Sequence, residues 1–128
     1  MDIFEWVVPI LFAGVFIALT SLVPEPARQR SNAIFVAGAG AAYLNGGLGL
    51  WEFALTTLAT LVAYGGLSSY RLVALAWVMH TCWDVVHHLY GRPIVFFAPT
   101  SSFGCAICDA VIAAWFFVGA PSVFRRRS

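Results

Sequence analysis

The sequence contains no lysine, and only 10% of its 128 residues are charged. A soluble domain carries about a quarter charged residues, so this chain lacks the polar residues that would cover a water-exposed surface. Its hydrophobic fraction is 61% and its mean hydropathy is +0.85. These values predict a protein that lies in a lipid bilayer. Nucleic acid is not expected as a partner, because no basic stripe alternates with exposed aromatic residues.

Cysteine is also scarce, with Cys82, Cys105 and Cys108 as its three occurrences. Three cysteines cannot form a disulfide framework, but Cys105 and Cys108 make a C-x-x-C pair. Such a pair can ligate a metal or act as a dithiol/disulfide couple. In a third interpretation, the two small side chains only pack at the start of a helix. The sequence leaves these three interpretations open.

Apolar runs predict an all-α fold, a single transmembrane helical domain over residues 1–128 with about five spans. The expected spans are residues 3–23, 32–45, 50–67, 70–90 and 103–120. The second run is short for a bilayer that requires about 20 residues. If it joined the third run as one broken helix, the chain would have four spans instead.

The arginines favour five spans over four. With five spans and the N-terminus outside, the cytoplasmic side holds Arg28, Arg30, Arg71 and the tail Arg125 to Arg127, and Arg92 alone lies outside. Positive residues concentrate on the cytoplasmic side of membrane proteins. The sequence therefore predicts a multi-pass membrane protein with its N-terminus outside and its C-terminus inside.

The fourth run carries the three histidines of the chain and an aspartate. At about 100° per residue, His80, Asp84 and His87 fall within roughly a 60° arc of the helix, and His88 lies at the edge of that arc. Ionisable groups are costly at membrane depth and usually face the interior of a bundle, where they pair or bind something. This face of the fourth run is therefore the first candidate for a functional site.

The predicted topology gathers other polar residues in the same outer half of the bundle. Cys105, Cys108 and Asp109 lie in the first two turns of the fifth span, and Glu52 begins the third. Tyr43, Asn45, Ser101 and Ser102 could line a pocket there, although turn and helix-capping roles would also account for them. Glu52 could likewise only stabilise the start of its helix.

We expect a metal site at this position, with zinc or copper as the ion that suits mixed nitrogen, sulfur and oxygen ligands. The candidate ligands are His80, Asp84, His87, His88, Cys105 and Cys108, with Asp109 as a further donor. If the site is catalytic, a metal-bound water would react with a lipid or another apolar substrate, and Glu52 or Asp109 would accept the proton. An open coordination position would indicate catalysis, and a closed shell a structural or transport role.

Two alternatives remain from the residues alone. The chain could be a membrane thiol-disulfide or quinone oxidoreductase that uses Cys105 and Cys108. It could also be a non-enzymatic accessory subunit or carrier whose polar cluster specifies helix packing. The chain could form a homo-oligomer or have a partner in a membrane complex. Whether the protein is an enzyme stays open at this stage.

Three sequence blocks carry a family resemblance: GAGAAYLNGGLGLWE, HTCWDVVHHLYGRPI and PTSSFGCAICDAVIAAW. They resemble an uncharacterised family of small bacterial multi-spanning membrane proteins, a domain of unknown function. The resemblance implies a bacterial integral membrane protein, which with the predicted spans gives a multi-pass protein of the bacterial inner (cytoplasmic) membrane, and it implies no particular activity. The Cys105-Ala-Ile-Cys108 fragment is also similar to membrane thiol oxidoreductases of the vitamin K epoxide reductase kind, which need a second cysteine pair that this chain lacks.

Overall fold

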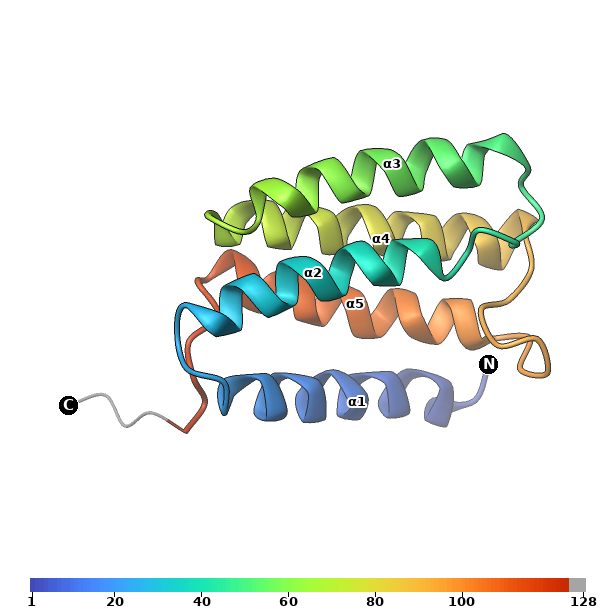
Figure 1. Cartoon of the computed structure of the whole chain (residues 1–128). Helices are drawn as coiled ribbons and strands as arrows, with labels where there is room; N and C mark the ends of the chain where they lie inside the picture. Colours follow the sequence, from blue (N-terminus) through green and yellow to red (C-terminus); the bar gives the residue numbers. More distant parts are fainter. Residues whose placement is uncertain (125–128) are drawn as a thin grey trace.

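The computed structural model describes residues 1–124, and this part of the chain forms five helices and no strand (Figure 1). The helices are α1 (Ile3–Ser21), α2 (Ala27–Ala41), α3 (Leu50–Gly65), α4 (Tyr70–Tyr90) and α5 (Ser101–Phe117). The all-α prediction with five helices is confirmed. The predicted tail, Arg125 to Arg127, lies outside the described residues.

The second and third helices are separate, so the alternative of one broken helix is wrong. Residues 42–49 connect α2 to α3, and the two helices run antiparallel (Figure 1). Gly47 and Gly49 have φ angles of +90° and +62° within this connection. Side chains with a Cβ rarely adopt such angles, and these glycines let the chain reverse before α3 begins at Leu50.

Helix α2 differs most from the prediction, since it begins at Ala27 and ends at Ala41 instead of covering residues 32–45. Its first turns include Arg28 and Asn32, and both are buried. Neither residue suits an apolar span, but Arg28 finds three backbone carbonyl acceptors. These hydrogen bonds, one of them to the distant Ala120, allow the helix to include a polar segment.

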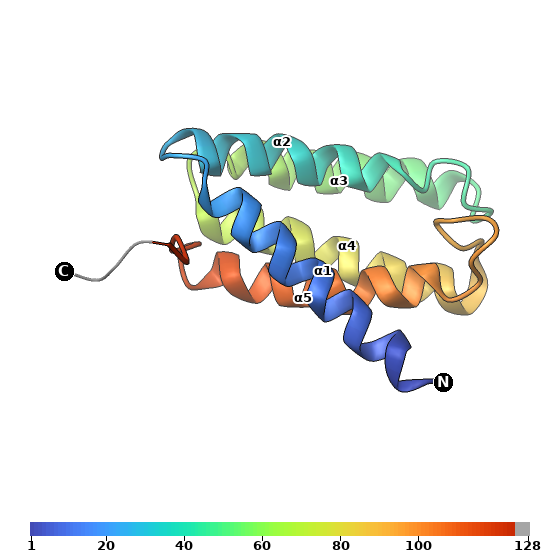
Figure 2. The same ribbon diagram turned by 90° about the horizontal axis from the view of Figure 1, so that it is seen from below.

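Helix α4 is the centre of the bundle, because it packs against α2, α3 and α5. Helix α1 packs against α5 and crosses it at an angle (Figure 2). The apolar core joins small and large side chains, among them Ala33, Ala74, Trp77, Ile112 and Phe116. The alanines let the helices approach closely, as in the small-residue packing typical of membrane bundles.

Every helix reverses direction relative to the previous one, so the connections gather at two ends (Figure 1). One end, which we call the N-terminal end, holds the N-terminus and the connections 42–49 and 91–100. The opposite end holds the α1–α2 and α3–α4 turns and the end of α5. Of the described arginines, Arg92 lies at the N-terminal end, whereas Arg28, Arg30 and Arg71 lie at the opposite end.

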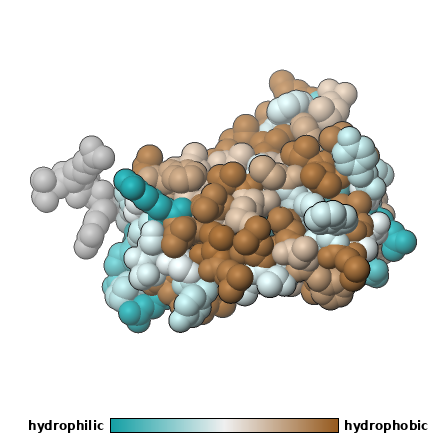
Figure 3. Space-filling view, turned by 90° about the horizontal axis from the view of Figure 1, so that it is seen from above, coloured by the Kyte–Doolittle hydropathy of each residue, from teal (hydrophilic) through white to brown (hydrophobic). Residues whose placement is uncertain are grey.

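The surface is largely apolar, with brown residues across the middle of one face and hydrophilic residues mostly toward the ends (Figure 3). Each helix exposes a large apolar side chain, for example Phe12, Phe35, Leu61, Val85 and Phe117. Among the described residues, α1 is the one helix long and apolar enough to cross a membrane by length and composition; α3 and α5 are apolar but shorter, at 16 and 17 residues.

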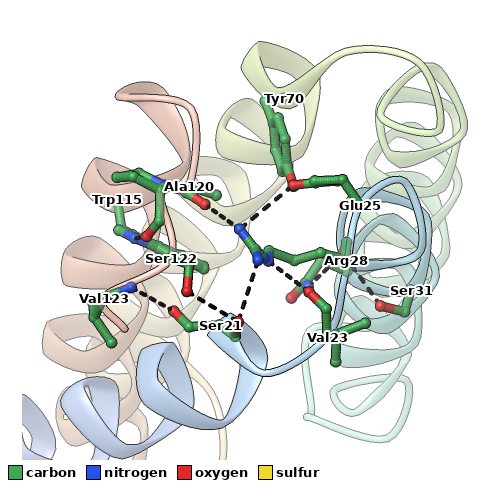
Figure 4. A network of polar contacts seen from close by, with 12 residues as sticks. Ser21, Val23, Glu25, Arg28, Ser31, Tyr70, Trp115, Ala120, Ser122 and Val123 are labelled. Carbon is green, nitrogen blue, oxygen red and sulfur yellow. Dashed lines mark hydrogen bonds and ion pairs between the residues drawn. The ribbon is translucent and has the colours of Figure 1, made fainter. Parts of the chain in front are cut away.

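A buried arginine ties the opposite end together (Figure 4). The Arg28 guanidinium donates hydrogen bonds to the carbonyl oxygens of Ser21, Val23 and Ala120 at 3.2, 2.9 and 2.9 Å. Ser21 ends α1, and Ala120 follows α5. Arg28 therefore supplies donors to carbonyl groups that helix ends leave without partners. The Glu25 carboxylate lies 3.6 Å from Arg28 and also accepts a hydrogen bond from the Tyr70 hydroxyl.

Candidate metal centre

Three side chains from α4 and α5 converge inside the bundle: His80, Asp84 and Asp109. The His80 Nδ1 atom lies 2.9 Å from Asp109 Oδ2 and 3.2 Å from Asp84 Oδ2. One nitrogen and two oxygens thus lie within 4.8 Å of one another, and all three residues are buried. We call these three residues the His80 group.

The spacing of these atoms suits a small metal ion. Zinc binds imidazole nitrogen and carboxylate oxygen at about 2.0–2.2 Å, and tetrahedral geometry then separates neighbouring ligand atoms by about 3.3 Å. The two measured separations, 2.9 and 3.2 Å, lie close to that value. The His80 group could therefore hold a metal ion after small side-chain movements.

The hydrogen bond on the other side of the imidazole also suits a metal ligand. His80 Nε2 lies 2.8 Å from the carbonyl oxygen of Ala39 in α2. A carbonyl oxygen only accepts, so the proton of a neutral imidazole is on Nε2 and the Nδ1 lone pair faces the two carboxylates. Metal-binding histidines usually donate their second N–H to a backbone carbonyl or carboxylate in this way.

Charge balance gives a further constraint. A neutral His80 with two ionised carboxylates places two negative charges in a buried space, which is strongly unfavourable. A divalent cation would bring the total charge to zero, and so would two protons shared by the three side chains. The group thus requires either a metal ion or protons between its members.

A chain of hydroxyl groups orients Asp84. The Tyr43 hydroxyl donates to Asp84 Oδ1 at 2.6 Å and accepts from the Ser102 hydroxyl at 2.8 Å. Ser102 Oγ in turn accepts the backbone N–H of Ile94 at 3.0 Å. Asp84 is therefore held through Oδ1, and its Oδ2 atom is left to face His80. Hydrogen bonds of this kind commonly fix the ligating carboxylates of metal sites.

A second buried polar pair lies next to the His80 group. His87 Nε2 is 2.8 Å from Glu52 Oε1, and the other carboxylate oxygen accepts the indole N–H of Trp83 at 3.0 Å. Glu52 Oε1 also accepts the backbone N–H of Leu48, at 3.2 Å, near the start of α3. Glu52 thus has the helix-start contact that the sequence predicted as one alternative and is also buried against His87.

The remaining predicted ligands lie outside the His80 group. His87 is buried but faces Glu52, while His88 is exposed on α4 and lies against the ring of Phe103. Cys105 and Cys108 are half-buried free thiols on α5. The structure therefore brings together His80, Asp84 and Asp109 and separates them from the other four candidates.

Three contributors to the two polar groups were not singled out from the sequence as site residues. Tyr43 and Ser102 could equally serve a turn and a helix start, and Trp83 could equally be a packing residue. In the structure Ser102 is fully buried and Tyr43 nearly so. One signal in the sequence is that Tyr43 follows α2 and Ser102 lies in the first turn of α5, both at the end where the polar residues gather.

A family model described as a family of unknown function (DUF6010) matches residues 4–122. This range includes all the residues of the His80 group and of the His87–Glu52 pair. Neither the curated proteins nor the solved structures contain a match to this chain. The function must therefore be argued from the site itself.

Proposed function

Because this chain belongs to the DUF6010 family, whose function is unknown, we propose its function from its own geometry: a multi-pass membrane protein of the bacterial inner membrane that binds a divalent metal ion through His80, Asp84 and Asp109. The proposal has two parts, the membrane location and the metal. Each part depends on different observations and has its own test.

The membrane location is supported by the distribution of apolar and polar residues. All five helices expose large apolar side chains, while the fully and nearly buried residues include Glu52, Asp84 and His87. A soluble protein shows the reverse arrangement. A bilayer accounts for both features, since ionisable residues in membrane helices face the bundle interior and pair there.

The metal site is supported most by one observation, the convergence of His80 Nδ1 and two carboxylate oxygens while His80 Nε2 is engaged by Ala39 O. Imidazole with carboxylates is a ligand set that zinc and other borderline divalent ions accept. The soft thiolates of Cys105 and Cys108 would have favoured copper(I), but they are not in the His80 group. We therefore favour zinc over copper.

Three protein ligands leave one position of a tetrahedral ion for water or substrate, which is the arrangement of catalytic rather than structural zinc sites. A metal ion held by His80, Asp84 and Asp109 would lower the pKa of a bound water and so supply a nucleophile near neutral pH. Asp109 is a ligand in this proposal, so Glu52 is the remaining candidate for the proton acceptor. A substrate that reaches the buried site from the bilayer would be a lipid or another apolar molecule.

Elemental mass spectrometry on the purified full chain tests the metal site. Wild type, His80→Ala, Asp109→Asn and the double variant Cys105→Ser/Cys108→Ser would be prepared in mild detergent with a histidine-free tag. His88→Ala is the matched control, because His88 is a histidine of the same helix that is exposed. We expect about one zinc per chain in wild type, in the cysteine variant and in His88→Ala, and a loss in the other two.

Three outcomes would contradict the proposal. A folded wild type without metal, even after incubation with zinc, would identify the His80 group as a proton-sharing polar core. Metal lost equally in His88→Ala would show adventitious binding. Metal lost in the cysteine variant would show that Cys105 or Cys108 contributes to the metal site.

A further inference from the structure

A cavity of about 400 Å³ lies at the N-terminal end of the bundle, beside the proposed metal site. Its lining comes from the two connections that meet there: Ala42, Tyr43, Asn45, Gly46, Arg92, Pro93, Ile94 and Phe96. Tyr43 lines the cavity, and its hydroxyl donates the hydrogen bond to Asp84. Tyr43 is therefore in contact with both the cavity and the His80 group.

Arg92 is held at this cavity by the glycine turn opposite. Its backbone N–H donates to the Gly46 carbonyl oxygen at 2.8 Å. Its aliphatic stem packs beside Gly47, where a Cβ at position 47 would lie in ordinary van der Waals contact, 3.5 Å from Arg92 Cγ. Within residues 1–124 the guanidinium has no ion-pair or hydrogen-bond partner. Arg92 is exposed, so its guanidinium is accessible to a ligand at the cavity.

The position of Arg92 is unusual for a membrane protein. The described arginines at the opposite end are Arg28, Arg30 and Arg71, and Arg92 is the exception at the end predicted to lie outside. Positive residues are less frequent on that side. The planar guanidinium of Arg92, which is exposed beside the cavity, can bind phosphate and carboxylate groups with two parallel hydrogen bonds.

We propose that the cavity binds a molecule with an anionic phosphate or carboxylate group, which Arg92 holds, while the apolar part lies along Pro93, Ile94 and Phe96. The exposed rings of Phe96 and Phe97 on the same connection suit contact with an acyl chain at the membrane interface. The inference rests on the proposed function, since it names the ligand class that would approach the metal site past Tyr43.

The test uses the full chain in neutral detergent and follows its melting temperature against ligand concentration. Two anionic probes, inorganic phosphate and dioctanoyl phosphatidic acid, distinguish a free anion from a lipid headgroup, and dioctanoyl phosphatidylcholine is the neutral lipid. The variants are Arg92→Gln, Arg92→Lys and the matched control Arg71→Gln, an exposed arginine at the opposite end. Zinc content is measured in every preparation.

We expect an anionic probe to raise the melting temperature of wild type and of Arg71→Gln. The apparent affinity of Arg92→Gln should be about tenfold weaker, the effect of losing one charge-assisted hydrogen-bond pair, and that of Arg92→Lys intermediate. A response to phosphatidic acid but not to phosphate assigns a lipid, and a response to both assigns a free anion. Equal responses in wild type and Arg92→Gln, or none in wild type, overturn the inference.

Zinc content separates this inference from the proposed function. If Arg92-dependent binding occurs in a protein that takes up no zinc, the anion site stands and the metal proposal fails. If zinc binds at the His80 group without any Arg92-dependent response, the metal proposal stands and the anion site fails. Arg92→Gln should keep its zinc, because Arg92 does not belong to the His80 group.

Discussion

The ring of Tyr43 stacks on the imidazole of His87, with ring centroids 3.8 Å apart and planes inclined by 26°. The same Tyr43 donates its hydroxyl proton to Asp84. Tyr43 therefore connects the two buried polar groups, the His80 group through a hydrogen bond and the His87–Glu52 pair through a ring contact. A substitution at this position can separate the two connections.

Tyr43→Phe removes the hydroxyl and keeps the ring. We expect zinc affinity to fall by about 10- to 100-fold, the usual effect of losing a hydrogen bond on a metal ligand, while the fold is retained. Competition with a chromophoric chelator measures this affinity. Ser102→Ala removes the next hydroxyl of the chain and should cause a smaller decrease in the same direction. Unchanged zinc affinity in Tyr43→Phe would show that Asp84 binds the metal equally well without the hydrogen bond from Tyr43.

Gly46→Ala tests how closely the α2–α3 connection packs on the His87–Glu52 pair. A Cβ at position 46 would lie 2.1 Å from His87 Nε2 and 2.7 Å from Glu52 Oε1. Since both side chains are buried, we expect the free energy of unfolding to decrease by about 1–3 kcal/mol. Titration with a denaturing detergent measures the change.

Gly38→Ala is the matched control for that variant. Gly38 lies inside α2, and a Cβ there would have no neighbour within 4 Å. Alanine should stabilise this helix by about 0.5–1 kcal/mol. If both glycine variants shifted stability in the same direction, the contact of Gly46 with His87 would not explain the result.

Arg28→Met tests the network at the opposite end. The substitution keeps an apolar stem but removes the guanidinium donor from the carbonyl groups of Ser21, Val23 and Ala120, of which Ser21 keeps a bond from the Ser122 hydroxyl. Buried acceptors that lose a charged donor cost a few kcal/mol, so we expect a loss of about 3 kcal/mol in unfolding free energy. Arg30→Met, at an exposed position of the same helix, should change stability by less than about 0.5 kcal/mol. Comparable losses in both variants would count against the network.

The topology has its own test in reporter fusions. Positive residues at the α1–α2 and α3–α4 turns predict that this end faces the cytoplasm. We expect a fluorescent protein at the C-terminus to be fluorescent in intact cells, and single cysteines placed in connections 42–49 and 91–100 to react with an impermeant maleimide from outside. The cysteine-free parent would replace Cys82, Cys105 and Cys108 by serine. Labelling of residues 66–69 from outside would contradict the orientation.

The sequence predicted much of the helical pattern and part of the site. The boundaries of α4 agree with the expected run, residues 70–90, and the helical arc correctly placed His80, Asp84 and His87 in the interior. Periodicity works here because a regular helix fixes the direction of each side chain from its position alone. Periodicity predicted the start of α2 less well, because the first turns of this helix contain Arg28, whose burial depends on an acceptor from the distant Ala120.

The composition and spacing alone determined that the chain is apolar and helical and that one face of residues 70–90 is polar. Only the tertiary structure decided which polar residues meet. It joined His80 to Asp109, directed His87 to Glu52, and left His88 exposed. The physical reason is that a contact between two helices depends on their separation, rotation and axial offset. Packing of the whole bundle sets these quantities, and no single segment of sequence contains them.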